Sequence, residues 1–153
     1  MSASGEPTCR VIRTSETYDG KQGLTYFNGV AAETVGSTAI CMHIVTVPPG
    51  GRAKAHLHES HETAIYVLSG EAVTLYGDKL QHHMINRAGD IVYIPAGVPH
   101  LPVNLGDVPT SAVIARTDPN EQESVVLLPE LEGAADLAIA RLKASGSGSI
   151  PET

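Results

Sequence analysis

Tryptophan is absent from this chain of 153 residues, phenylalanine occurs once and cysteine twice. Cys9 and Cys41 are far apart and form no CxxC pair, so the chain lacks the pattern of a disulfide framework, a redox motif or a thiolate metal site. Basic residues are also scarce: ten lysines and arginines face seventeen acidic residues and leave a formal net charge of −7. Proteins that bind nucleic acid neutralise phosphates with many clustered cations, so we expect no nucleic acid partner.

Long apolar runs are missing as well. No segment approaches the roughly 20 apolar residues that cross a bilayer, and Met1–Arg10 lacks the apolar stretch of a secretory signal. We therefore expect a cytoplasmic protein with no membrane partner. The length and the hydrophobic fraction of 42% are typical of one globular domain whose core is built from valine, isoleucine, leucine and alanine.

Most of the chain consists of short segments rich in β-branched and apolar residues, each bounded by glycine, proline, asparagine or aspartate. Because no helical pattern separates these segments, they indicate an all-β sandwich or barrel rather than a parallel α/β sheet. The predicted strands span residues 10–13, 24–30, 38–47, 54–58, 63–68, 71–76, 82–86, 90–94, 101–104, 111–117 and 124–128.

The pattern changes near the end of the sequence. Leu131, Ala135, Ala138 and Leu142 recur at helical spacing and predict an amphipathic helix over residues 133–144, lying on the barrel or on a partner subunit. The glycines and serines that follow indicate a flexible tail. The expected organisation is an N-terminal arm at 1–23, a β-barrel at 24–130, a short C-terminal helix at 131–144 and a tail at 145–153.

Candidate metal ligands begin with His56 and His58. Residues two apart on a strand point to the same face, so both imidazoles can approach one ion from the same side. Glu62 keeps this parity if the three residues before it do not shift the pleat, and a second strand would bring His100 across the barrel. Three imidazoles and a carboxylate suit one divalent transition metal ion: Mn, Fe, Co, Ni, Cu or Zn. An isolated HxH pair, in contrast, is more often a surface feature of a polar loop.

Two segments of the chain resemble the two motifs of the cupin superfamily. The first segment has the spaced glycine, the HxH pair and the glutamate of the first motif. The second segment matches the second motif at every fixed position. Between the two segments, 18 residues separate Gly70 from Gly89, as in small single-domain microbial cupins. The resemblance implies a double-stranded β-helix, or jelly-roll barrel, with the metal held by His56, His58, Glu62 and His100. The motif residues are Gly50, His56, His58 and Glu62, then Gly89, Pro95, Gly97, His100 and Asn104.

The first segment departs from the family pattern by one residue. Seven residues, Thr63 to Ser69, separate Glu62 from Gly70 where the common pattern has six. If the strand is aligned with the family pattern from its Gly70 end, Thr63 occupies the position of the glutamate ligand. His61, two residues earlier, then points to the inside of the barrel. A one-residue bulge near Thr63 would restore Glu62; otherwise His61 could coordinate, which would give a site made of histidines only.

Four further side chains are candidates for the substrate pocket. Arg52 and Lys54 share the parity of His56, so their cationic ends could reach the barrel mouth and bind an anionic molecule such as a carboxylate, or they could form a solvated rim. Tyr66 and Tyr93 could supply a hydroxyl to the pocket, although packing explains them equally well.

The resemblance implies two classes of function. One is a metal-dependent enzyme of the oxygenase, isomerase or lyase class, acting on a small molecule in the barrel, for which an anion is one candidate. The other is a cupin that binds or senses a small molecule without transforming it, and the fold cannot choose between the two. Cupins also pair through sheet edges and exchange N-terminal strands, so the resemblance implies a homodimer in which residues 9–13 and 24–30 take part.

Overall fold

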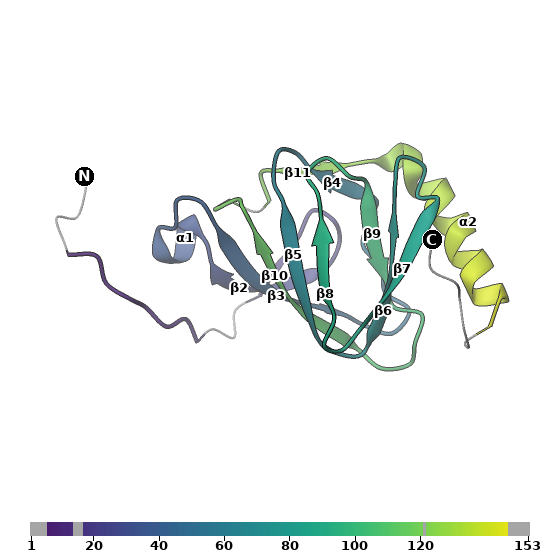
Figure 1. The fold of residues 1–153 in the computed structure, drawn as a ribbon, viewed down its shortest axis with the longest axis horizontal. Helices are drawn as coiled ribbons and strands as arrows, with labels where there is room; N and C mark the ends of the chain where they lie inside the picture. Colours follow the sequence, from purple (N-terminus) through teal and green to yellow (C-terminus); the bar gives the residue numbers. More distant parts are fainter. Residues whose placement is uncertain (1–5, 14–16, 121, 147–153) are drawn as a thin grey trace.

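The computed structural model describes residues 6–13, 17–120 and 122–146. Two antiparallel sheets face one another and enclose a barrel, with one helix lying outside it at the C-terminal end of the described chain (Figure 1). The all-β jelly-roll fold with a short C-terminal helix is therefore confirmed. Each strand alternates between side chains that point into the barrel and side chains that point away from it, as a pleated strand requires.

The larger sheet has six strands in the order β1-β2-β3-β10-β5-β8. Its strand β10 pairs over its whole length with β3 on one side, and from Ser111 to Arg116 with β5 on the other. The strands are β1 (Thr17–Asp19), β2 (Thr25–Val30), β3 (Cys41–Val47), β10 (Thr110–Arg116), β5 (Thr63–Ser69) and β8 (Ile91–Ile94).

The smaller sheet has five strands in the order β11-β4-β9-β6-β7. They are β11 (Val125–Leu127), β4 (His56–His58), β9 (His100–Val103), β6 (Glu71–Tyr76) and β7 (His82–Arg87). Three helical segments complete the described fold: α1 (Ala32–Val35), the 3-10 turn η1 (Pro129–Leu131) and α2 (Glu132–Ala144).

Each predicted strand between residues 24 and 128 overlaps an observed one, but the prediction of a strand at 10–13 is wrong. These residues are β-branched enough to form a strand, yet no segment that the structure describes pairs with them, and a strand without partners is not stable. Three described elements were not predicted: β1, the single turn α1 and the 3-10 turn η1. The strand β1 is short and polar, so only its pairing with β2 identifies it.

The helix α2 covers the outer face of the five-stranded sheet. Its buried side chains Ala135, Ile139 and Leu142 belong to the same apolar cluster as the strand residues Leu75 and Leu101. The two leucines are almost fully buried, which stabilises the fold by roughly 1.5–3 kcal/mol each. Both faces of this sheet are therefore packed, one against the barrel interior and one against α2.

Polar contacts fix the start of the helix to the strand that carries the HxH pair. The guanidinium of Arg52 donates to Glu132 at 2.5 Å and to Asp136 at 3.2 Å, and Glu132 also accepts the backbone N–H of Ala55 at 2.7 Å. The helix is consequently joined to the chain immediately before His56.

The predicted division of the chain at 23, 130 and 144 remains a prediction. Part of the arm, residues 1–5 and 14–16, and the tail from residue 147 onward lie outside the described residues. Within the part of the chain that the structure describes, no helix has the length and apolar character needed to span a bilayer.

Candidate metal centre

Two neighbouring strands of the five-stranded sheet bring three histidines together. His56 on β4 is the direct cross-strand partner of His100 on β9, and His58 follows two residues later on the same face of β4. All three side chains are buried, with 2 to 4% of their surface exposed. The sequence placed the pair on one face by strand parity, and the strand pairing supplies the third imidazole.

Turn residues of the second motif fix the position of β9. Gly97 adopts a φ of 77°, which a residue without a Cβ takes readily, and its N–H donates to the carbonyl of His58 at 2.9 Å. At the other end of β9, the buried amide of Asn104 donates to the carbonyls of Val47 and Val108 at 3.0 and 2.7 Å. These bonds hold β9 at both ends and therefore fix His100 beside β4.

The three imidazoles are close enough to share one ion. Their ring centroids are separated by 4.4 Å between His56 and His100, 5.3 Å between His56 and His58, and 5.7 Å between His58 and His100. One nitrogen from each ring lies within 4.8 Å of the other two, and among the described residues this is the group of histidine, cysteine and carboxylate side chains that could hold a metal.

Hydrogen bonds set the tautomers of two of the rings. Nδ1 of His56 lies 2.7 Å from the carbonyl oxygen of Lys54, and Nδ1 of His100 lies 2.8 Å from that of Val98. A carbonyl only accepts, so Nδ1 carries the hydrogen and donates it. Nε2 of each ring then keeps the lone pair that a metal ion needs.

Burial keeps these imidazoles uncharged. It lowers the pKa of His56 to about 4, with the charge of Arg116 as a further cause, against a backbone hydrogen bond that raises it. Burial also holds the pKa of His58 and of His100 well below the ordinary value, and Arg116 again adds to the effect. Neutral imidazole is the form that coordinates a metal, so the three rings are in that form at neutral pH.

The third ring provides a test of whether a metal fits. His58 places Nδ1 3.3 Å from the hydroxyl of Ser124, while its Nε2 is buried and has no hydrogen-bond partner among the described residues. A buried nitrogen without a partner is unfavourable unless something else binds its lone pair. A borderline divalent ion satisfies this nitrogen and the other two together, so the residues fit the ion expected from the sequence.

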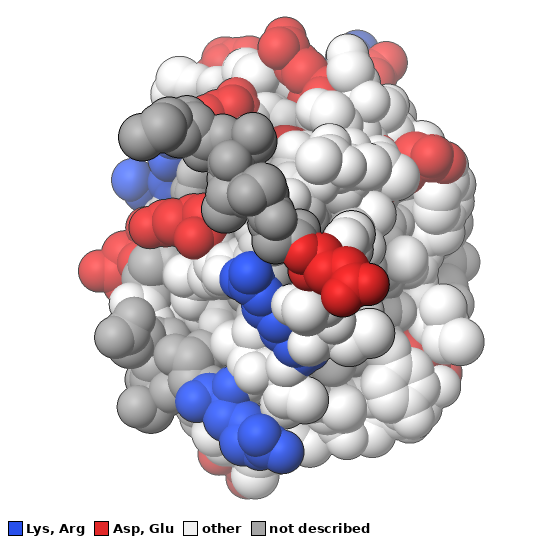
Figure 2. Space-filling model, turned by 90° about the vertical axis from the view of Figure 1, so that its left-hand side faces the viewer, with Lys and Arg blue, Asp and Glu red and all other residues white. Residues whose placement is uncertain are grey.

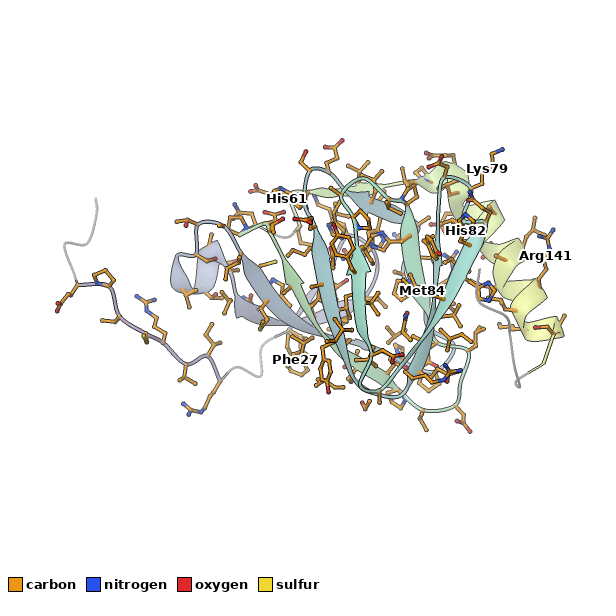
Figure 3. All side chains as sticks on the ribbon, in the orientation of Figure 1. Phe27, His61, Lys79, His82, Met84 and Arg141 are labelled. Carbon is orange, nitrogen blue, oxygen red and sulfur yellow. The ribbon has the colours of Figure 1, made fainter. Side chains whose placement is uncertain are left out.

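The structure does not bring Glu62 together with the histidines. Its side chain is exposed, and its carboxylate accepts the hydroxyl hydrogen of Tyr93 at 2.7 Å on the outside of the six-stranded sheet. The alternative ligand His61 lies in the loop before β5 (Figure 3), with its Nε2 3.9 Å from the carboxylate of Asp118. Thr63, one residue after Glu62, is the buried residue that points inward at this place.

The extra residue of the first motif is absorbed away from the site. The pairing of β5 with β10 is regular from Thr63 to Val67 and shifts between Val67 and Ser69, so the irregularity includes Leu68. A bulge near Thr63 would have restored Glu62, but this pairing has no irregularity there. The irregularity lies at the Gly70 end of the strand instead. Strand parity then turns Thr63 inward and Glu62 outward.

Arg116 is a site residue that the sequence did not single out. It ends β10, is only 5% exposed, and donates from Nε to the hydroxyl of Thr63 at 3.1 Å. A signal was present, because Ala112, Ile114 and Arg116 share one parity along the predicted strand and the first two are core residues. The polar pair Thr74 and Asn86, joined by a 2.6 Å hydrogen bond, was likewise missed.

Arg116, Thr74, Asn86 and two of the three histidines line an internal cavity of about 70 Å³ between the two sheets. Most of its lining is apolar, and its polar members come from both sheets. No carboxylate belongs to this lining among the described residues. The polar members are His56, His100, Thr74, Asn86 and Arg116.

The four predicted pocket residues lie elsewhere in the structure. Arg52 binds the acidic residues of α2, and Lys54 is exposed, since the regular strand begins only at His56. Tyr66 and Tyr93 project from the outer face of the six-stranded sheet. None of the four lines the described cavity.

Comparison with known proteins identifies the family. A family model described as the cupin domain matches residues 43–115. The chain is 31% identical over 83 residues to the uncharacterized protein MJ1618 of Methanocaldococcus jannaschii, covering 54% of this chain and 63% of that protein. It is 33% identical over 75 residues to the oxalate decarboxylase OxdC of Bacillus subtilis, covering 48% of this chain and 20% of that protein. The chain thus spans less than two thirds of the length of either relative.

Solved structures share the fold at lower identity. A recombinant oxalate oxidase in complex with glycolate superposes with a TM-score of 0.67 at 18% identity, covering 95% of this chain and 78% of that one. The polyketide cyclase RemF of Streptomyces resistomycificus gives 0.64 at 23%, covering 80% and 86%. The oxalate decarboxylase of Lactobacillus farciminis, in a formate complex, gives 0.63 at 20%, covering 86% and 39%. Residues 43–115 of this chain are therefore a cupin domain, and the chain shares the fold of these solved structures.

Proposed function

We propose that this protein holds one divalent transition metal ion on His56, His58 and His100 and acts on a small carboxylate that binds beside it in the barrel. The observation that carries this proposal is a cluster of three buried, neutral imidazoles, two of which line a cavity that also contains the guanidinium of Arg116. The three histidines come from one sheet, and the cation comes from the other.

Charge balance favours an anionic ligand. Three neutral imidazoles do not offset the charge of a divalent ion, and Arg116 adds another positive charge to a cavity whose described lining contains no carboxylate. Buried charges in proteins are normally compensated by an opposite charge nearby. A carboxylate ligand supplies this compensation, and a guanidinium binds a carboxylate through paired hydrogen bonds.

Cavity size and relatives support a small acid. A cavity of about 70 Å³ suits a ligand of a few non-hydrogen atoms. One curated relative is an oxalate decarboxylase, and two solved structures of the same fold contain formate or glycolate. We infer a carboxylate of this size as the substrate class.

The chain's own residues would bind and orient this acid. Arg116 holds one carboxylate group, Thr74 and Asn86 offer hydroxyl and amide groups further along the cavity, and the apolar lining excludes bulk water. A divalent ion at the three histidines supplies Lewis-acid polarisation of a ligand oxygen and positions for a second ligand. Oxygenase, isomerase and lyase reactions remain the candidate classes.

One observation favours the alternative, a cupin that binds a small acid without transforming it. Since no carboxylate lines the described cavity and the three histidines would be occupied by the metal, a general base of ordinary pKa is not among these lining groups. In this alternative the metal and Arg116 act as a receptor for the acid.

Metal analysis and calorimetry test the proposal. Protein purified without added metal, then loaded separately with Mn, Fe, Co, Ni, Cu or Zn, is expected to bind one ion per chain. It is then titrated with oxalate, glycolate and formate, with pyridine as a neutral control. Product formation and oxygen uptake with the same acids separate enzyme from receptor. Absence of binding for all six metals would overturn the proposal, and equal affinity for acids and pyridine would overturn the substrate class.

A further inference from the structure

A groove of about 360 Å³ lies outside the barrel, between helix α2 and the turn that joins β6 to β7. Its floor is apolar and is made by Leu75 and Leu80 on the sheet side and by Ala138 on the helix side. The helix covers the outer face of the five-stranded sheet, whereas His56 and His100 line the cavity on the inner face. The groove is therefore separate from the candidate metal centre.

Four basic side chains line the same groove, and no carboxylate belongs to its lining among the described residues. Figure 3 shows Lys79 and His82 at the end of the β6–β7 hairpin and Arg141 on the helix beside it. The fourth is His83. The ring of Tyr76 lies 5.3 Å from that of His82, measured between centroids, and supports this imidazole at the groove. Basic groups from two elements far apart in the sequence thus meet over an apolar floor.

The two cations of the groove lack the acidic partners that other cations have. Arg52 and Arg87 both form salt bridges. At the end of the molecule where α1 lies, acidic side chains likewise stand beside basic ones (Figure 2). Neither Lys79 nor Arg141 forms an ion pair with a described carboxylate, in a chain of seventeen acidic and ten basic residues, and Asp78 is not part of the lining. The groove therefore has positive charge that an anionic ligand can compensate.

The turn at residues 77–81 is a fixed support for its lysine. Leu80 adopts a φ of 53°, a left-handed conformation that is unfavourable for a residue with a Cβ. Its side chain is 2% exposed and belongs to the apolar cluster on which α2 packs, and this burial offsets the cost. The N–H of Leu80 donates to the carbonyl of Gly77, and the N–H of Lys79 donates to the side-chain oxygen of Gln81, each at 3.0 Å.

We propose that this groove binds an organic phosphate, a phosphate monoester with a small apolar body. The three terminal oxygens of a monoester can each accept from one of Lys79, His82 and Arg141, whereas a carboxylate has only two oxygens. The apolar floor packs against the body of the ligand. A volume of about 360 Å³ falls within the range of small-molecule sites, about 300–1,000 Å³. The site does not depend on the function proposed above, because none of its residues belongs to the histidine cluster.

Titration calorimetry with phenyl phosphate tests the proposal. At an ionic strength of about 20 mM, where screening is weak, the full chain is expected to bind one phenyl phosphate with a dissociation constant of about 1 mM or tighter. Inorganic phosphate lacks the apolar body and benzyl alcohol lacks the charge, so each should bind about tenfold more weakly or less. Phenyl phosphate is too large for the internal cavity of about 70 Å³, so its binding does not report on that cavity.

Three substitutions test the groove itself. Lys79→Met and Arg141→Met each remove one charged donor, so each should weaken phenyl phosphate binding by about tenfold. Ala134→Phe keeps both charges but fills part of the groove, and it should weaken binding to a similar extent. Lys143→Met is the matched control, because Lys143 is an exposed cation on the same helix and lies outside the groove lining. Circular dichroism checks that each variant is folded.

The outcomes decide the proposal. Equal binding by the wild type and Lys143→Met, with weaker binding by the three groove variants, supports it if the same pattern holds after metal removal with EDTA. Absence of phenyl phosphate binding to the wild type would overturn it. Equal weakening in Lys143→Met would reduce the effect to net charge and would also overturn the site. Binding that disappears with the metal would place the phosphate at the histidines instead. Metal content, measured in parallel, reports separately on the proposed function.

Discussion

The two sheets contribute different chemistry to the region around the internal cavity. The five-stranded sheet supplies three neutral imidazoles, held on β4 and β9. The six-stranded sheet, at the position where the motif resemblance implied a carboxylate, supplies a hydroxyl and a guanidinium instead, from Thr63 and Arg116. The side that carries the proposed metal ligands is therefore kept, while the facing side has a hydroxyl and a guanidinium in place of the carboxylate that the resemblance implied.

The largest effect is expected on the five-stranded side. His56→Ala and His100→Ala each remove one of three proposed ligands, so metal affinity should fall by more than the roughly 10–100-fold typical of residues that only orient a ligand. Metal content after dialysis measures this. His82→Ala is the control, since His82 is exposed on β7 outside the cluster (Figure 3). Histidine variants that keep one ion per chain would show that the site is elsewhere.

A pH effect on stability should come next. The folded state favours neutral His56, with a pKa of about 4 against 6.5, so its contribution is complete above pH 6.5 and is lost as the pH falls toward 4. Between pH 6.5 and pH 5, metal-free protein should lose ~2 kcal/mol of unfolding free energy from this residue alone. His58 and His100 act in the same direction.

Urea unfolding of metal-free protein at about pH 7 and pH 5 measures this loss, and His56→Gln should remove part of it. Arg116→Met should leave most of the pH dependence, because burial rather than Arg116 is the largest cause of the lowered pKa values. Equal stability at the two pH values would contradict the buried, neutral state of the cluster.

A change on the six-stranded side should affect the acid rather than the metal. Arg116→Met removes the guanidinium from the cavity, so oxalate affinity of the metal-loaded protein should fall by about 10–100-fold, the value of a charge-assisted hydrogen bond of roughly 1.5–3 kcal/mol. Metal content should stay near one ion per chain. Calorimetry with oxalate measures the first quantity and metal analysis the second.

Arg52→Met is the matched control for this experiment. It removes a guanidinium of the same size that binds α2 rather than the cavity, so it should lower thermal stability and leave oxalate affinity unchanged. If both arginine variants bind oxalate as the wild type does, the anion site is not at Arg116.

The smallest effect is expected at Glu62 and His61. Since neither side chain belongs to the histidine cluster, Glu62→Gln and His61→Ala should each change metal affinity by less than about twofold. Metal titration measures this. Loss of the ion from Glu62→Gln would instead mean that the loop at residues 59–62 turns inward in the metal-bound protein and that the six-stranded side does complete the ligand set.

The second motif was the part of the site that the sequence predicted best. Gly97 and Asn104 occupy positions where a positive φ and a buried amide are required, so the residue types themselves indicate the turns. His100 follows at a fixed distance from Gly97, and its place beside His56 results from strand pairing. Short-range backbone requirements of this kind can be predicted from the residue types alone.

The first motif was less predictable because it depends on register. A one-residue excess between Glu62 and Gly70 can be absorbed anywhere along β5, and each choice turns a different residue inward. The pairing of β5 with β10 decides this, and β10 lies more than forty residues away in the sequence. The parity of Arg116 with Ala112 and Ile114 pointed inward, but its partner Thr63 is known only from that pairing.

The two elements that complete and cover the five-stranded sheet are synthesised last, and this affects how the chain folds as it is made. The strand β11, which pairs with β4, and the helix α2, which buries Leu75 and Leu101, are both made after all the strands that they complete. Until then, the outer side of the sheet that carries the histidines is bare apolar surface and β4 has an open edge. Such intermediates are prone to aggregate and to bind chaperones. Premature termination before β11 should therefore leave an insoluble product even though every proposed metal ligand has already been synthesised.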